Sequence, residues 1–172
     1  MAPGGHLIHR FFGSLRPGGP RRADDEWARS QLLPAEVELW RKMSGPDRRH
    51  AAGVARRVQR ALGHEASRPV LAAALLHDVG KTASGLRTPG RVVATLTAAV
   101  ASPGFARAWS NESGIVRRIG LYLRHPELGG DMLAMAGSDK LTVRWTREHH
   151  QPEDDWTIDR HVGSVLKAAD ND

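Results

Sequence analysis

One stretch near the middle of this 172-residue chain has no polar face. From Pro69 to Leu76 the sequence reads PVLAAALL, and a helix built from it is apolar all the way round. Such a helix needs other elements around it, because any exposed side would place apolar surface in water. Proline is tolerated in the first turn of a helix, so Pro69 can open this one. The stretch therefore predicts a helix at the centre of a bundle.

The segments on either side have the spacing of amphipathic helices. Their apolar residues recur three or four positions apart, and no run alternates as a strand would. We therefore predict an all-α fold, organised as a single-domain helical bundle because 172 residues suit one ordinary domain. The predicted helices cover residues 24–43 with a break near Pro34, 47–62, 69–76, 91–100, 115–125, 126–136, 139–150 and 158–169.

Turn and cap residues set the expected boundaries of these helices. We expect Pro103 and Gly104 to end the helix at 91–100, and Ser138 and Thr157 to cap the last two helices, since hydroxyl groups accept backbone N–H bonds at helix starts. Residues 1–24 are rich in glycine and proline and show no periodic pattern. They are predicted to form a flexible N-terminal arm, which leaves residues 25–172 for the helical domain.

The chain contains no cysteine. Disulfides, thiolate zinc sites, iron–sulfur clusters and cysteine nucleophiles are therefore excluded. Any metal ion must be held by histidine, aspartate or glutamate side chains.

The formal net charge of +6 raises the question of a nucleic-acid partner. Arginine supplies nearly all of the positive charge, and the basic residues are spread along the chain with few aromatic residues between them. This pattern favours a solvated surface over a nucleic-acid face. No apolar run approaches the roughly 18 residues that span a bilayer, and the first residues lack a secretory signal, so we expect a cytoplasmic protein without a membrane partner.

The decisive pattern is a set of ionisable side chains on the predicted buried faces of the helices. His50 lies four residues before Val54, and Asp170 lies four residues after Leu166. Each ionisable residue therefore shares a helix face with an apolar residue. The full set of such positions is His50, His77, Asp78, His149 and Asp170, with His125 at a helix junction before Pro126. A single buried histidine is usually a hydrogen-bonded core residue, but this many buried ionisable groups indicate a shared metal site.

Lys81 follows Asp78 by three residues and His77 by four, so it lies on the same helix edge. It could neutralise a carboxylate or bind a substrate phosphate. Equally, a lysine at the C-terminal end of a helix could be a surface residue that complements the helix dipole. The spacing alone does not distinguish these two interpretations.

The residues 77–81, HDVGK, resemble the HDIGK signature of the HD superfamily of metal-dependent phosphohydrolases. His50 resembles the first metal ligand of that family, and Asp170 resembles its closing aspartate. HPELGGDML, residues 125–133, is similar to the HPEIG block of the HD-GYP subgroup, and His149-His150 resembles its paired histidines. The order is kept from residue 50 to residue 170, although the chain contains no Gly-Tyr-Pro sequence.

The resemblance implies an HD-type helical domain over residues 25–172 with one or two divalent metal ions, iron or manganese first. One metal would be held by His50, His77, Asp78 and Asp170. A second would share Asp78 and take His125, His149 and His150. Asp78 and Lys81 would be the catalytic residues.

The activity implied is hydrolysis of a phosphate monoester or diester by metal-activated water, with a nucleotide or another small phosphate ester as substrate. Two alternatives remain at this point. One is a regulatory or nucleotide-binding module that keeps the fold and turns over little substrate. The other is a nucleic-acid-binding protein, which would bind with steep salt dependence and without regard to metal.

Overall fold

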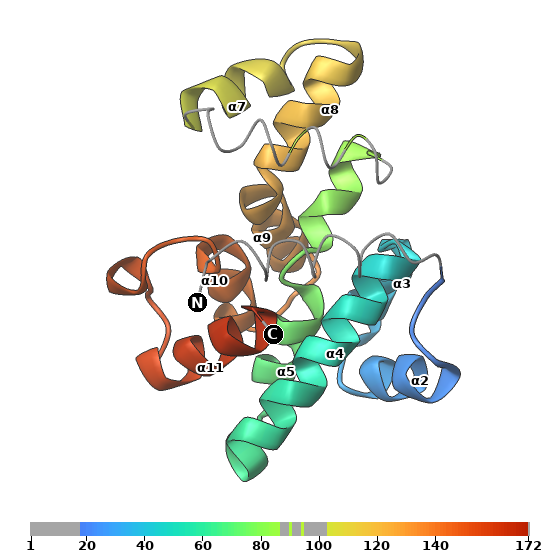
Figure 1. Ribbon diagram of the computed structural model, residues 1–172, viewed down its shortest axis with the longest axis vertical. Coiled ribbons are helices and arrows are strands. Elements are labelled where there is room, and N and C mark those ends of the chain that lie inside the picture. The colour runs from blue at the N-terminus through green and yellow to red at the C-terminus, as the bar shows by residue number, and fades with distance from the viewer. Residues whose placement is uncertain (1–17, 87–89, 91–93, 95–102, 172) are drawn as a thin grey trace, which may run out of the picture.

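A computed structural model describes residues 18–86, 90, 94 and 103–171 of the chain. Within these residues every regular element is a helix, which confirms the all-α prediction (Figure 1). The α-helices are α2 (Arg22–Ser30), α3 (Pro34–Lys42), α4 (Gly45–Leu62), α5 (Arg68–Leu76), α7 (Pro103–Ser110), α8 (Gly114–Leu123), α9 (His125–Met135), α10 (Lys140–Glu148) and α11 (Arg160–Asn171). Short 3-10 helices lie at η1 (Gly63–Glu65), η2 (Val79–Ser84) and η3 (Glu153–Asp155).

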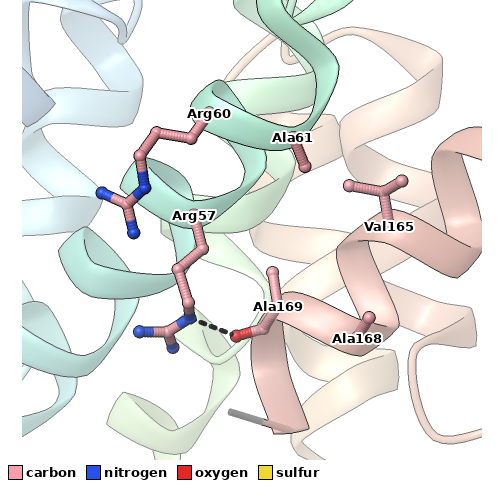
Figure 2. A pocket seen from close by; sticks show the side chains of 6 residues that line it. All are labelled: Arg57, Arg60, Ala61, Val165, Ala168 and Ala169. Carbon is pink, nitrogen blue, oxygen red and sulfur yellow. Dashed lines mark hydrogen bonds between the residues drawn. The ribbon is translucent and has the colours of Figure 1, made fainter.

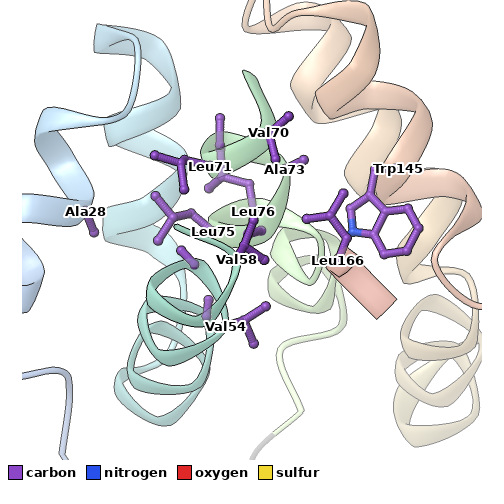
Figure 3. Close-up of a cluster of buried hydrophobic side chains, with 14 of the residues drawn as sticks. Ala28, Val54, Val58, Val70, Leu71, Ala73, Leu75, Leu76, Trp145 and Leu166 are labelled. Atoms are coloured by element: carbon purple, nitrogen blue, oxygen red, sulfur yellow. The ribbon is translucent and has the colours of Figure 1, made fainter. Parts of the chain in front are cut away.

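The apolar helix α5 lies at the centre of the bundle, as predicted. Every residue from Val70 to Leu76 is buried, and α3, α4, α10 and α11 all contact the helix. Figure 3 shows its leucines gathered next to Val58 and Val54 of α4, with Leu166 of α11 and Trp145 of α10 to one side of them. Each large apolar side chain that is fully removed from water contributes about 1.5–3 kcal/mol, so this contact region is a main source of stability.

Helix α4 begins two residues earlier than predicted, at Gly45. Ser44 is its N-cap, and the Ser44 hydroxyl accepts a hydrogen bond from the Asp47 backbone N–H. Pro46 fits the first turn because a backbone N–H there needs no helical partner. Gly63, with a φ of 56°, ends the helix in a conformation that other residues rarely adopt.

Two predicted caps are wrong by one or two residues. The side chain of Asp139, and not that of Ser138, accepts a backbone bond at the start of α10, from Leu141. At the start of α11 the Asp159 carboxylate accepts the Val162 N–H. Thr157 instead donates both its backbone N–H and its hydroxyl to the buried Glu148 carboxylate. Carboxylates compete well with hydroxyls as caps at these positions.

The region before α8 also differs from the prediction. Pro103 and Gly104, expected to end a helix, begin helix α7. Proline fits the first turn of a helix as well as the residues beyond its end, and the sequence pattern did not separate the two. The predicted helix at 91–100 lies outside the described residues except for Ala94, which is buried.

At the N-terminal end, α2 begins at Arg22, inside the segment predicted as an arm. Residues 1–17 of that segment lie outside the described part of the chain, so the arm stays a prediction. None of the helices that the structure describes is both long enough and apolar enough to cross a membrane.

The turn η2 packs directly against α9, and glycines allow the close approach. A side chain at Gly80 would overlap the carbonyl group of His125, and its Cβ would lie 2.6 Å from the backbone nitrogen of Gly129. Both neighbours are backbone atoms, which cannot move aside without shifting a helix. The absence of a side chain at Gly80 therefore sets how close Asp78 lies to His125.

We expect the Gly80→Ala substitution to destabilise the fold by at least about 1–3 kcal/mol, because the new methyl group forces η2 and α9 apart. Urea unfolding followed by circular dichroism measures this change. Gly19→Ala is the control, since its Cβ would have only ordinary contacts at 3.7 and 3.8 Å. Equal stability of the two variants would contradict the packing described here.

Candidate metal centre

The structure brings the predicted site residues together from five helices and the turn η2. Two groups offer ligand atoms that all lie within 4.8 Å of one another. One group contains His50, His77 and Asp78, and the other contains His125, His149 and His150. Asp170 joins the first group through His50 and His77.

Most of these residues lie at helix ends. His77 and His149 are the C-cap residues of α5 and α10, and His125 is the first residue of α9. Asp78 follows His77 as the chain leaves helical geometry, with φ −99° and ψ 6°. Neighbouring residues inside a helix point about 100° apart, so a helix end is where His77 and Asp78 can both face one centre.

The Asp78 carboxylate lies at the middle of the cluster. Its Oδ1 is 3.4 Å from Nε2 of His125 and 3.8 Å from Nε2 of His149. Its Oδ2 is 3.5 Å from Nε2 of His77 and 2.5 Å from Nζ of Lys81. Asp78 is therefore the residue that connects the two groups.

The three buried histidines have their ring orientation fixed by their own helices. Nδ1 lies 3.0 Å from the Ala74 carbonyl in His77, 2.8 Å from the Tyr122 carbonyl in His125 and 2.9 Å from the Thr146 carbonyl in His149. A carbonyl oxygen only accepts, so each Nδ1 carries the hydrogen and donates it. In the neutral ring this leaves the Nε2 lone pair available, which is the usual arrangement of a metal-binding histidine.

The Nε2 atoms of His77, His125 and His149 are buried and have no hydrogen-bond partner among the described residues. Leaving a buried polar atom unpaired costs about 1–3 kcal/mol. Three such atoms around one carboxylate therefore destabilise the folded protein unless a ligand binds them. Nitrogen and carboxylate ligands of this kind suit divalent iron, manganese, zinc or nickel, so the residues present fit a metal ion.

The side of the cluster formed by α4 and α11 is partly open. Nε2 of His50 is 2.9 Å from Oδ1 of Asp170, and the same oxygen is 3.5 Å from Nε2 of His77. The His50 side chain is 32% exposed, whereas those of Asp170 and His77 are buried. His150 is exposed as well, although its ring centroid lies only 4.0 Å from that of His149. A solute could therefore reach the cluster past His50 and His150.

Electrostatics within the cluster hold Asp78 ionised. Burial alone would raise the pKa of Asp78, but the Lys81 ammonium and His77 outweigh it and hold the pKa well below its usual range. Burial would likewise lower the pKa of Lys81, and the Asp78 carboxylate raises it instead. Lys81 pairs with Asp78 inside the cluster, and its side chain is only 18% exposed. It is therefore not a surface lysine at a helix end.

The histidines divide by charge. Burial would lower the pKa of His77, but the nearby Asp78 and Asp170 carboxylates raise it from 6.5 to about 9. Burial lowers the pKa of His125, and burial together with the neighbouring His150 lowers that of His149 well below its usual range. At neutral pH, His125 and His149 are therefore ready to bind a metal, whereas His77 must first release a proton.

Two further contacts hold the backbone next to the cluster, and the sequence analysis identified neither of them. Nζ of Lys167 donates to the His149 carbonyl at 2.6 Å, and Nε of Arg57 donates to the Ala169 carbonyl at 2.9 Å. Both bonds end on backbone carbonyl oxygens, which every residue has, so the residue types do not indicate where such bonds form. The one available signal for Arg57 is its spacing of seven from His50, which places both on one face of α4.

A surface hollow of about 430 Å³ lies beside this last contact (Figure 2). It runs between α4 and α11, with Arg57 and Arg60 on one side and small apolar side chains on the other. The predicted metal ligands do not line it. The hollow is therefore separate from the cluster, although Ala169 directly precedes Asp170.

We expect binding of Mn²⁺ at pH 7 to release about one proton, mainly from His77, because metal and proton compete for the same Nε2 lone pair. The folded-state pKa of about 9 means that affinity rises with pH up to about 9 and then levels off. Calorimetric titration in two buffers of different ionisation enthalpy measures the protons released. A titration with no proton release and no dependence of affinity on pH would contradict this assignment.

Comparison with known proteins identified no relative of this chain. No protein-family model matches the chain, and neither a curated protein nor a solved structure matches it. The geometry of the cluster and the order of its residues in the sequence therefore carry the functional argument.

Proposed function

We propose that this protein is a metal-dependent phosphohydrolase of the HD type, which hydrolyses a nucleotide or another small phosphate ester. One observation carries the proposal. The buried Nε2 atoms of His77, His125 and His149 have no partner among the described residues and all face the Asp78 carboxylate. The expected cofactor is one or two divalent ions, iron or manganese first.

The proposed ligand sets follow the two groups in the structure. His50, His77, Asp78 and Asp170 would hold one ion. His125, His149 and His150 would hold a second, with Asp78 shared because its two oxygens face the two groups. The resemblance of residues 77–81 to the HDIGK signature supports the same sets.

A divalent cation in such a site supplies Lewis acidity toward phosphate oxygens and lowers the pKa of bound water toward neutral. The residues of this chain do the rest. Asp78 is held ionised and in place by Lys81. His50 and His150 are the most exposed residues of the two groups, so a phosphate group would approach the cluster past them. That the protein works in the cytoplasm stays a prediction from its sequence, as does the preference for a solvated surface over a nucleic-acid face.

The test combines metal content with turnover. Protein purified without chelator is expected to contain about one or two equivalents of iron or manganese. It should also hydrolyse bis-p-nitrophenyl phosphate, p-nitrophenyl phosphate or a nucleotide from a standard panel. Asp78→Asn and His149→Ala are expected to lose metal and turnover together, because each removes a ligand while keeping the helices intact.

The matched control is His64→Ala, which removes an exposed histidine of η1 that lies outside both groups. It should keep both metal and activity. Failure of the unsubstituted protein to take up iron, manganese, zinc or nickel would refute the metal centre. Tight metal binding without turnover on any phosphate ester would refute the enzyme and leave a binding or regulatory module.

A further inference from the structure

Asp170 must be placed accurately if its carboxylate is to contact two histidines at once. It is 5% exposed, and its Oδ1 lies 2.9 Å from Nε2 of His50 and 3.5 Å from Nε2 of His77. Both distances depend on where α11 places the backbone of residues 169 and 170. A contact between this backbone and α4 would therefore help to position the carboxylate opposite His50.

Arg57 of α4 provides such a contact. Its Nε donates a 2.9 Å hydrogen bond to the carbonyl of Ala169, the residue before Asp170 (Figure 2). That carbonyl belongs to the α11 backbone directly before Asp170. A guanidinium group is charged at every relevant pH, and a hydrogen bond from a charged donor is stronger than one from a neutral donor. The bond is thus suited to fixing the backbone of α11 next to Asp170.

The position of Arg57 on α4 links it to the metal centre. It follows His50 by seven residues, which is two helical turns, so both side chains lie on the face of α4 that packs against α11. His50 contacts the Asp170 carboxylate, and Arg57 contacts the backbone one residue earlier. One helix therefore supplies both a ligand and the support for the ligand opposite it.

We propose that Arg57 is a positioning residue, which holds the last turn of α11 so that Asp170 faces His50 and His77. This inference rests on the proposed metal centre, with Asp170 as a ligand. Groups that orient metal ligands typically alter metal affinity by about 10- to 100-fold when they are removed.

Arg60 offers a matched control. It lines the same hollow as Arg57, about one turn further along α4, and carries the same charge on an exposed side chain. Figure 2 shows both guanidinium groups extending to the same side of α4, with the bond to Ala169 drawn from Arg57. A general effect of positive charge would be the same for both arginines, whereas a positioning effect belongs to Arg57.

The experiment is a calorimetric Mn²⁺ titration of the full chain and of Arg57→Ala, Arg60→Ala, Asp170→Ala and the double variant Arg57→Ala/Asp170→Ala. We expect Arg57→Ala to weaken Mn²⁺ binding about 10-fold or more and Arg60→Ala to change it less than about 2-fold. In the Asp170→Ala background, the Arg57 substitution should have no further effect, because the two act through one ligand.

A readout without metal accompanies the titration. Amide hydrogen exchange in the last turn of α11 should be faster in Arg57→Ala than in Arg60→Ala, while the α5 core is protected equally in both. Arg57→Lys keeps the charge without the Nε donor. It should also bind Mn²⁺ more weakly than the unsubstituted protein, and it serves in place of the alanine variant if that variant does not fold.

Unchanged Mn²⁺ affinity in the Arg57 variants, or an Arg57 effect that persists at full size without Asp170, would overturn the inference and leave the metal centre standing. Absence of Mn²⁺ binding by the unsubstituted protein would overturn the metal centre, and this inference with it.

Discussion

The buried charge of Asp78 is the constraint on which the rest of the site depends. A carboxylate removed from water is costly unless opposite charges or hydrogen-bond donors surround it. Here Lys81 pairs with one oxygen, and the imidazoles of His77, His125 and His149 face the two oxygens from three different helices. The central apolar helix α5 ends next to this carboxylate, so the packing that builds the core also determines where the charge is placed.

The burial of most of the cluster residues could be predicted because the face of a helix on which a residue lies depends only on helical spacing. His149 lies four residues after Trp145, and the two are 1% and 2% exposed. The start of α7 and the caps of α10 and α11 could not be predicted with the same accuracy. Ser138 and Asp139 are both good cap residues, and which one is used depends on how the incoming chain packs.

Contacts that involve backbone atoms could not be predicted from the sequence. The bond from Arg57 joins residues 112 positions apart and ends on a carbonyl group, which every residue possesses. The close approach of Gly80 to His125 is likewise a backbone contact. Residue types and their spacing therefore predict which side chains gather at the centre. The backbone packing that holds them at a given distance becomes visible only in the folded chain.

The contact between His50 and Asp170 spans 120 residues of chain. An ion bound by both would act as a reversible cross-link that closes most of the polypeptide into a loop and lowers the entropy of any state that keeps it. Because the unfolded chain does not hold these groups together, free metal in the surroundings would shift the folding equilibrium by mass action. The fraction of the protein that is folded would then follow the metal supply as well as the strength of its core.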